Sequence, residues 1–130
     1  MNADFQRGLA EFNQGDFYAC HDTLEAIWME AEPSERNFYQ GILQIAVACY
    51  HLENANWHGS VILLGEGTYR LRAYLPTYAG LQLDRFHATS CQLLQELQQL
   101  SPEALVSFLD AGRGSELPRP QIIRMEAAAS

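Results

Sequence analysis

The sequence is poor in basic residues. Eight lysine and arginine residues stand against sixteen aspartate and glutamate residues, so the formal net charge at pH 7 is −8. No stripe of basic residues interrupts this acidic balance. Nucleic acids and anionic membrane surfaces attract proteins through clustered positive charge, so we expect neither as a partner.

Cysteine is also scarce. Cys20, Cys49 and Cys91 are odd in number and lack the spacing of metal-binding knuckles, which argues against a disulfide framework. Each lies beside apolar residues within a helical pattern. We therefore expect three buried, reduced thiols.

Long apolar runs are absent as well. The N-terminus carries Asp4 and Glu11 and has no apolar run of the kind that a signal peptide requires. The apolar run over residues 42–52 is shorter than the about 20 residues that span a bilayer. We expect a cytoplasmic protein with no membrane partner.

Strands are not predicted, because no segment alternates apolar and polar residues with period two. The 130 residues suffice for one domain with a hydrophobic core. We expect residues 1–111 to form this domain and residues 112–130 to form a tail, laid across the bundle through Ile122 and Ile123 and disordered at its Ala-rich end. Apolar spacings of three and four predict an all-α, compact bundle of five to six helices over residues 3–13, 17–31, 35–54, 59–75, 82–100 and 102–110.

Capping residues mark several helix ends. Gly15 is placed for a left-handed C-cap, and Asp16 can cap the helix that follows it. Ser34 is a good N-cap for the third helix. Ser101 followed by Pro102 is a helix start signal, because proline is favoured at the first helical position.

The connection over residues 54–59 is short. Such a loop makes the two flanking helices neighbours, most simply antiparallel. In the second of these helices Gly65 and Gly67 each weaken helix formation by about 1 kcal/mol relative to alanine. We expect close helix packing or a kink there.

Residues 40–51 form the stretch around which the chain is organised. Gln44 and His51 are polar residues in an otherwise apolar run, and their spacing of seven puts them on one helix face. In the preceding helix His21 falls inside the apolar stripe and Glu25, four residues on, lies at its margin. A buried amide or imidazole left unpaired costs about 1–3 kcal/mol. We therefore predict an interior polar cluster of His21, Glu25, Gln44 and His51, flanked by Trp28, Tyr50 and Asn56.

This polar cluster has several interpretations. It can be a structural hydrogen-bond network, with Glu25 bonded to His21 and Gln44 to His51, or a small-molecule pocket lined by these groups. His21, Glu25 and His51 are also ligand types for a divalent metal, with Gln44 or water completing the shell. An acid–base pair of His21 and Glu25 would make a hydrolase-like enzyme. In a structural or interaction protein the cluster would be closed and function would lie on the surface, for instance in a homodimer.

Two other groups of residues are weaker candidates. Asp84, His87 and Cys91 lie along one side of a helix, but the members of a catalytic triad normally come from different elements, so we interpret them as a polar rim. The arginines of the tail are expected to dock on the acidic body or on a second subunit. These are Arg113, Arg119 and Arg124.

Two motifs resemble those of a known family. The first is Phe12-Asn13, Phe17 and the run from His21 to Trp28, and the second is the run from Gln40 to Gln44, then Tyr50-His51-Leu52, Asn56 and Gly59. Over residues 5–75 the chain resembles the bacterial, archaeal and plastid family called domain of unknown function 309. The family usually has Glu at the position of Asp22 and Gly at that of Ala55. The resemblance implies a small all-helical domain with a cytosolic or plastid-type location, and it implies no activity.

Overall fold

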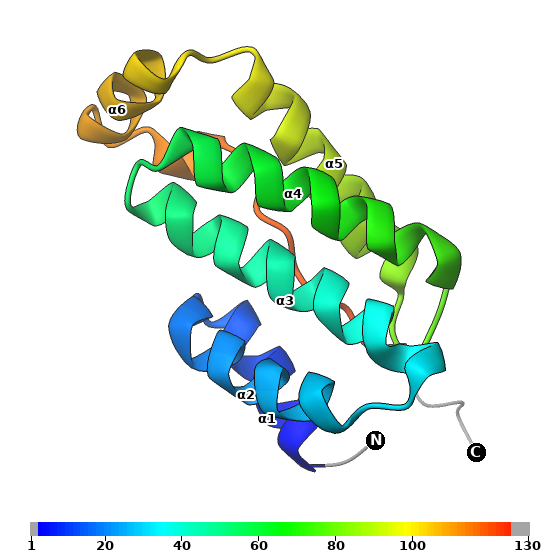
Figure 1. The fold of residues 1–130 in the computed structure, drawn as a ribbon. Helices are drawn as coiled ribbons and strands as arrows, with labels where there is room; N and C mark the ends of the chain where they lie inside the picture. The colour runs from blue at the N-terminus through cyan, green and yellow to red at the C-terminus, as the bar shows by residue number, and fades with distance from the viewer. Residues whose placement is uncertain (1–2, 126–130) are drawn as a thin grey trace.

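The computed structural model describes residues 3–125 and is built from α-helices packed in an all-α bundle (Figure 1). The isolated bridges Tyr78–Leu81 and Leu81–Arg124 are its only strand-like pairings in the described part of the chain. The helices are α1 (Ala3–Asn13), α2 (Phe17–Glu30), α3 (Pro33–Glu53), α4 (Trp57–Leu71), α5 (Leu83–Gln98) and α6 (Pro102–Asp110), with 3-10 turns η1 (Arg72–Tyr74) and η2 (Gly114–Glu116). Within residues 3–125 no helix is long and apolar enough to cross a bilayer.

Most of the predicted caps are confirmed. Gly15 has φ +82°, the left-handed conformation expected after a helix. The Asp16 carboxylate accepts a hydrogen bond from the Ala19 backbone at 3.4 Å, and the Ser101 hydroxyl accepts one from Ala104 at 3.0 Å. The cap predicted at Ser34 is wrong, because Glu32 is the N-cap and α3 begins at Pro33, two residues earlier than predicted.

Helices α3 and α4 pack most closely at two glycines. A Cβ atom at Gly67 would lie 2.7 Å from Cγ1 of Ile45 and 2.8 Å from the backbone oxygen of Gly41. A Cβ atom at Gly41 would in turn lie 2.8 Å from Leu71. The two helices run antiparallel, as the short connection predicts (Figure 1). The absence of side chains at these two positions lets the backbones approach each other.

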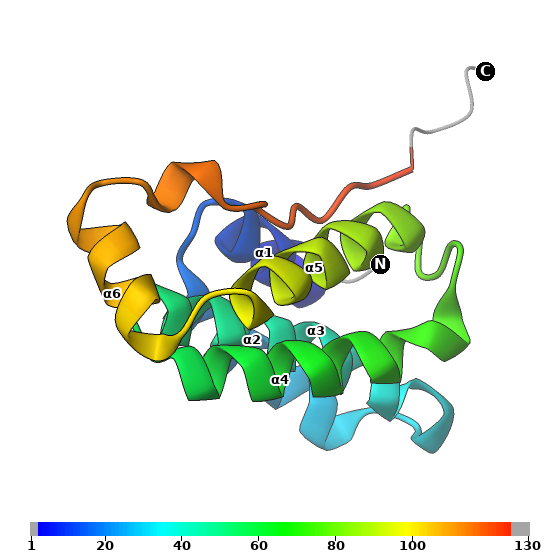
Figure 2. The same ribbon diagram turned by 90° about the horizontal axis from the view of Figure 1, so that it is seen from above.

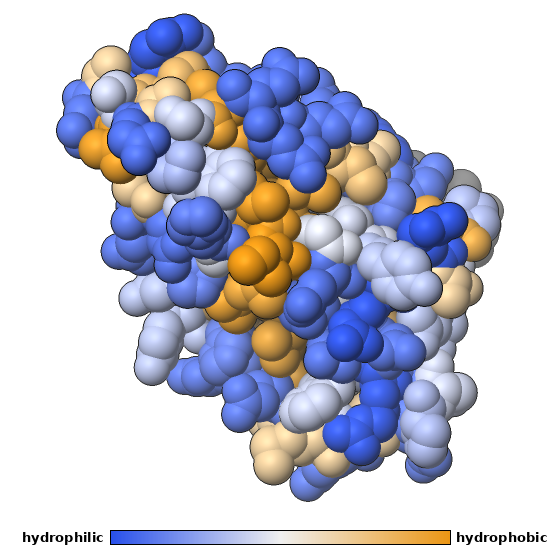
Figure 3. Space-filling model, turned by 45° about the horizontal axis from the view of Figure 1, so that its top comes forward, coloured by the Kyte–Doolittle hydropathy of each residue, from blue (hydrophilic) through white to orange (hydrophobic). Residues whose placement is uncertain are grey.

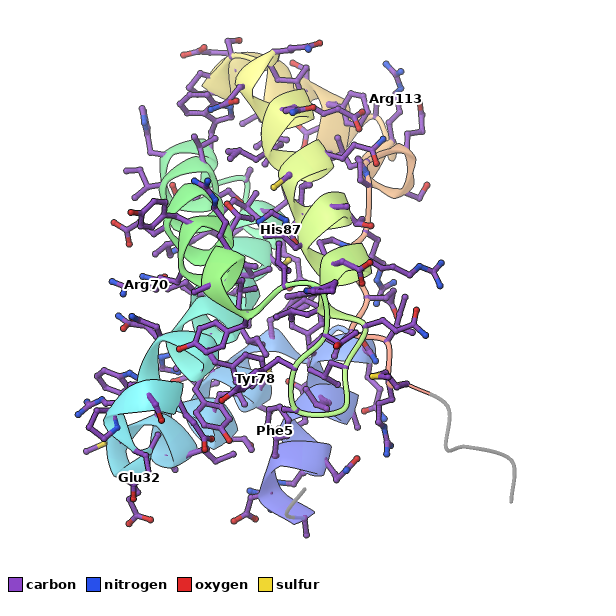
Figure 4. All side chains as sticks on the ribbon, turned by 90° about the vertical axis from the view of Figure 1, so that its right-hand side faces the viewer. Phe5, Glu32, Arg70, Tyr78, His87 and Arg113 are labelled. Carbon is purple, nitrogen blue, oxygen red and sulfur yellow. The ribbon has the colours of Figure 1, made fainter. Side chains whose placement is uncertain are left out.

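An aromatic cluster surrounds Phe38, three residues before Gly41 on α3. Phe38 on α3 is fully buried, and its ring contacts those of Phe5 on α1, Tyr39, Tyr74 and Tyr78. Tyr78 belongs to the connection before α5, which brings this loop against the bundle (Figure 4). The tyrosines are half-buried, as expected of rings whose hydroxyl groups reach polar partners or water.

The chain after α6 runs back along the bundle between α1 and α5 (Figure 2). The amide nitrogen of Asn13 donates to the Ile122 carbonyl at 2.9 Å, and the Asn13 amide oxygen accepts from the Ile122 backbone nitrogen at 2.8 Å. Ile122 is buried. The extended tail laid across the bundle is therefore confirmed up to residue 125, whereas the disorder predicted for the Ala-rich end concerns residues 126–130, outside the described part of the chain. The domain division at residue 112 stays a prediction.

Candidate functional site

Four rings form a continuous row on the surface between α2 and α3. The ring centroids lie 6.5 Å apart for Tyr18 and His21, 6.0 Å for Tyr18 and Tyr50, and 6.2 Å for Tyr50 and His51. Tyr18 is 63% exposed and Tyr50 is 39% exposed. We call this surface, with Asp22 and Glu25 beside it, the α2–α3 face.

His21 forms the predicted pair with Glu25 but is not buried. Its Nε2 atom lies 3.1 Å from Oε2 of Glu25, and its Nδ1 atom lies 3.2 Å from Oδ1 of Asp22. The side chain of His21 is 33% exposed and that of Glu25 is 47% exposed. The interior position predicted for this pair is therefore wrong. The buried side of α2 is narrower than its apolar stripe, and it consists of Phe17, Cys20, Thr23 and Leu24.

His51 has a different partner from the one predicted. The Asn56 amide oxygen accepts a hydrogen bond from the Gly59 backbone and caps α4, so the Asn56 amide nitrogen is the donor to Nδ1 of His51, at 3.2 Å. A Cβ atom at Gly59 would lie 2.7 Å from the His51 ring, which shows that the ring rests on this glycine. Asn56 therefore orients His51 and starts the next helix with one side chain.

Gln44 is buried as predicted, but it belongs to a second network that joins α3 to α4. Its amide nitrogen donates to Glu66 at 2.9 Å, and its amide oxygen accepts from Nε of Arg70 at 3.0 Å. Arg70 also donates to Asn37 at 2.7 Å. The predicted Gln44–His51 hydrogen bond is therefore wrong. Gln44 satisfies both ends of its amide with α4 instead.

Trp28 lies farther along α2, under a cation. The Arg36 guanidinium is 4.8 Å from the centroid of the Trp28 ring. The indole Nε1 atom is buried and has no hydrogen-bond partner among the described residues. No ring contact or hydrogen bond described for residues 3–125 joins Trp28 to His21 or His51.

The interior cluster that the sequence predicts is therefore split into separate parts. Within residues 3–125 no three His, Cys, Asp or Glu side chains are grouped so that they could hold a metal ion. His21, Glu25 and His51 therefore do not form the predicted metal site. Two cavities, of about 390 and 550 Å³, lie elsewhere, and none of these three residues lines either of them. The pocket that acid–base chemistry at His21 needs is not provided by either cavity.

His87 and Cys91, two of the three residues interpreted as a polar rim, lie together on α5. His87 faces α4, with Nε2 3.1 Å from the backbone oxygen of Thr68, and Sγ of Cys91 lies 3.8 Å from the ring nitrogens of His87 (Figure 4). Asp84 is exposed in the first turn of α5. Burial raises the pKa of the Cys91 thiol, which disfavours the thiolate that a nucleophile needs.

The three cysteines are expected to be alkylated slowly in the folded protein at pH 7. Burial raises the pKa of Cys20 and of Cys49 to about 12 and also raises that of Cys91, so each thiolate is rarer than in the unfolded chain. Iodoacetamide labelling followed by mass spectrometry measures this, with protein in denaturant as the control. The rates should rise as the pH increases. Labelling of folded Cys91 at the denatured rate would contradict the prediction.

Sequence reasoning missed two groups of functional candidates. One is Tyr18, which precedes His21 by three residues and so lies on the same side of α2. The charges that satisfy Gln44 were missed too, because Glu66 and Arg70 come from a helix whose register against α3 is not visible in the spacing. The spacing of three residues between Tyr18 and His21 is the one sequence signal that points to either group.

The N-terminal part of the chain, which holds this region, is similar to a known protein family. Residues 5–63 match the model described as Domain of unknown function (DUF309). This segment, 59 of the 130 residues, is similar to that family. It runs from α1 into α4 and includes the α2–α3 face, Gln44 and Asn56. The DUF309 segment thus carries every site residue that the sequence predicts.

A bacterial protein is also similar to this chain. The chain is 32% identical over 93 residues to the Bacillus subtilis protein named "Uncharacterized protein YpuF". The alignment covers 70% of this chain and 52% of the relative, so the chain spans about half of the relative's length. No solved structure matches the chain. The relative's printed name gives no biochemical role.

Proposed function

We propose that this protein is an interaction module whose α2–α3 face binds a cationic segment of a partner protein. The observation that carries this proposal is the exposure of two tyrosine rings in contact, Tyr18 and Tyr50, between two histidines. Tyrosine is enriched at the centres of interfaces, where its ring supplies contact area and its hydroxyl a hydrogen bond. An ordinary packing role does not require such exposure.

The chemistry around the rings favours a cation. Aromatic faces attract arginine and lysine side chains. Asp22 and Glu25 stand beside the rings and supply carboxylates that can accept charge-assisted hydrogen bonds. The net charge of −8 attracts basic partners over longer distances. An arginine or lysine side chain lying on the tyrosines with its charge at these carboxylates fits this arrangement.

Exposed apolar side chains give a second reason for an interaction role. An apolar strip crosses one face of the molecule between hydrophilic flanks (Figure 3). Met29 on α2 is 65% exposed, and Ile62 on α4 is 58% exposed. Contiguous apolar surface on a folded domain commonly marks a protein-binding region.

A fluorescently labelled hexapeptide of alternating arginine and lysine tests this proposal by anisotropy titration at low salt. Tyr50→Ala and Tyr18→Ala should each weaken binding roughly two- to fivefold, because an exposed cation–π contact contributes about 0.5–1 kcal/mol. Tyr69→Ala is the matched control, since Tyr69 is 72% exposed and lies on α4, beside Arg72. It should leave the affinity unchanged.

Equal losses in all three variants would mean that the peptide binds the acidic surface without preference, and the proposal would fail. A second copy of the chain is the competing occupant of the same face. Sedimentation velocity distinguishes the two, because a homodimer formed through Tyr50 would dissociate in the Tyr50→Ala variant without any peptide.

A further inference from the structure

The larger of the two cavities lies outside the α2–α3 face and is not used by the proposed function. Its volume is about 550 Å³, within the range of about 300–1,000 Å³ typical of small-molecule sites. Its walls come from the α1–α2 turn, the end of α3, α5, α6 and the segment over residues 114–120. It therefore joins segments that are distant in the sequence.

The lining of this cavity is mainly apolar. Phe17, Leu52, Leu93 and Leu117 contribute to it, and three of these four side chains are otherwise buried in the core. Such a lining removes apolar ligand surface from water, which stabilises binding by about 25 cal/mol per Å² of buried area. It favours a ligand with an aliphatic or aromatic body.

One cation stands at the edge of the cavity. Arg119 is part of the lining, and its guanidinium lies on the α1–α2 turn, where a Cβ atom on Gly15 would be 3.3 Å from its terminal nitrogen. The hydrogen bond described for this side chain within residues 3–125 is a 3.4 Å contact to the Asn13 carbonyl. A guanidinium has five N–H donors, so most of its fork remains available to a carboxylate.

The acidic neighbour of Arg119 is compatible with an anion. Glu53 also lines the cavity, and burial raises the pKa of its carboxyl, against the opposing effect of Arg119. Its negative charge is therefore less stable than that of a solvated glutamate. A ligand carboxylate at Arg119 would lie near this carboxyl group, and the charge of Arg119 would offset the repulsion between them.

We infer that this cavity binds a small apolar carboxylic acid, with its hydrocarbon body against Leu52, Leu109 and Pro118 and its carboxylate on Arg119. The C-terminal segment forms one wall, and Asn13 holds that segment through two hydrogen bonds to Ile122. The ligand would thus bridge the bundle and its tail.

Isothermal titration of the full chain with decanoate, below its micellar concentration, tests the inference. Decanoate should bind at one saturable site, and Arg119→Gln should weaken this binding about tenfold, because a charge-assisted pair is lost. Arg119 is exposed, so the substitution leaves the core intact. Arg124→Gln removes a charge from the same tail outside the cavity lining and should leave the affinity unchanged.

Two further probes distinguish the contribution of the hydrocarbon chain to the affinity from that of the head group. Decanol and decylamine carry the same chain without the negative charge, and both should bind at least tenfold more weakly than decanoate. Equal affinity for decanol would overturn the role of Arg119, and absence of saturable decanoate binding would overturn the site. Neither result bears on peptide binding at the α2–α3 face, which is measured separately.

Discussion

Replacing Phe38 by alanine is expected to lower the free energy of unfolding by about 3–5 kcal/mol. The side chain is fully buried, and its ring lies 4.7 Å from that of Tyr78, 5.2 Å from Tyr39 and 5.6 Å from Tyr74, centroid to centroid. Alanine would leave a cavity among rings that come from α3, η1 and the loop before α5. Because the rings of these segments pack against one another, the segments cannot move far enough to fill the cavity.

Urea denaturation followed by circular dichroism measures this loss. Tyr69→Ala is the control, because Tyr69 is an aromatic residue on the surface and should change stability by no more than about 0.5 kcal/mol. A loss below about 1 kcal/mol for Phe38→Ala would show that the aromatic cluster does not organise this end of the bundle.

The two glycines of α4 are expected to respond to alanine in opposite directions. At Gly67 the new Cβ atom would lie 2.8 Å from the backbone oxygen of Gly41, which cannot move without separating α3 from α4. Overpacking of this kind costs about 1–3 kcal/mol. At Gly65 a Cβ atom would meet nothing within 4 Å, so alanine should stabilise the helix by about 0.5–1 kcal/mol.

Thermal unfolding of the two variants side by side tests this contrast. The same chemical change is made twice, two residues apart on one helix, so differences in helix propensity cancel. A stabilised Gly67→Ala protein would contradict the close approach of α3 and α4. A destabilised Gly65→Ala protein would contradict the open surroundings of Gly65.

The helices were predictable because their causes are local. Apolar spacings of three and four locate α1, α2 and α5, and Asp16 and Ser101 cap their helices as expected. Helix α4 ends at Leu71, earlier than the predicted residue 75, because the chain tightens into a 3-10 turn at Arg72. Helix ends depend on such short-range competition and are located less well than helix centres.

The arrangement of the polar residues was less predictable. An apolar stripe is about 100° wide, and His21 lies close enough to its margin that a small rotation of α2 takes the ring to the surface. Gln44 and His51 share a helical face, but long side chains choose partners on neighbouring helices, here Glu66 and Arg70. His51 stands next to a turn and is reached by Asn56. Helix rotation and register come from tertiary packing.

The α2–α3 face and the apolar cavity are consequences of that packing. Tyr18 and Tyr50 are 32 positions apart, and their contact depends on how α2 lies against α3. The cavity needs the segment over residues 114–120 to return to the end of α3. No local pattern carries this information, since each wall is an ordinary helix or loop by itself.

The most direct test of the central claim is a nuclear magnetic resonance titration of labelled protein with the arginine–lysine hexapeptide. We expect the largest chemical-shift changes on Tyr18, His21, Glu25, Tyr50 and His51, and we expect them to saturate together. The proposed peptide site would be contradicted by shift changes spread over the acidic surface. It would also be contradicted by changes centred on α5 and α6 with the shifts of these five residues unchanged.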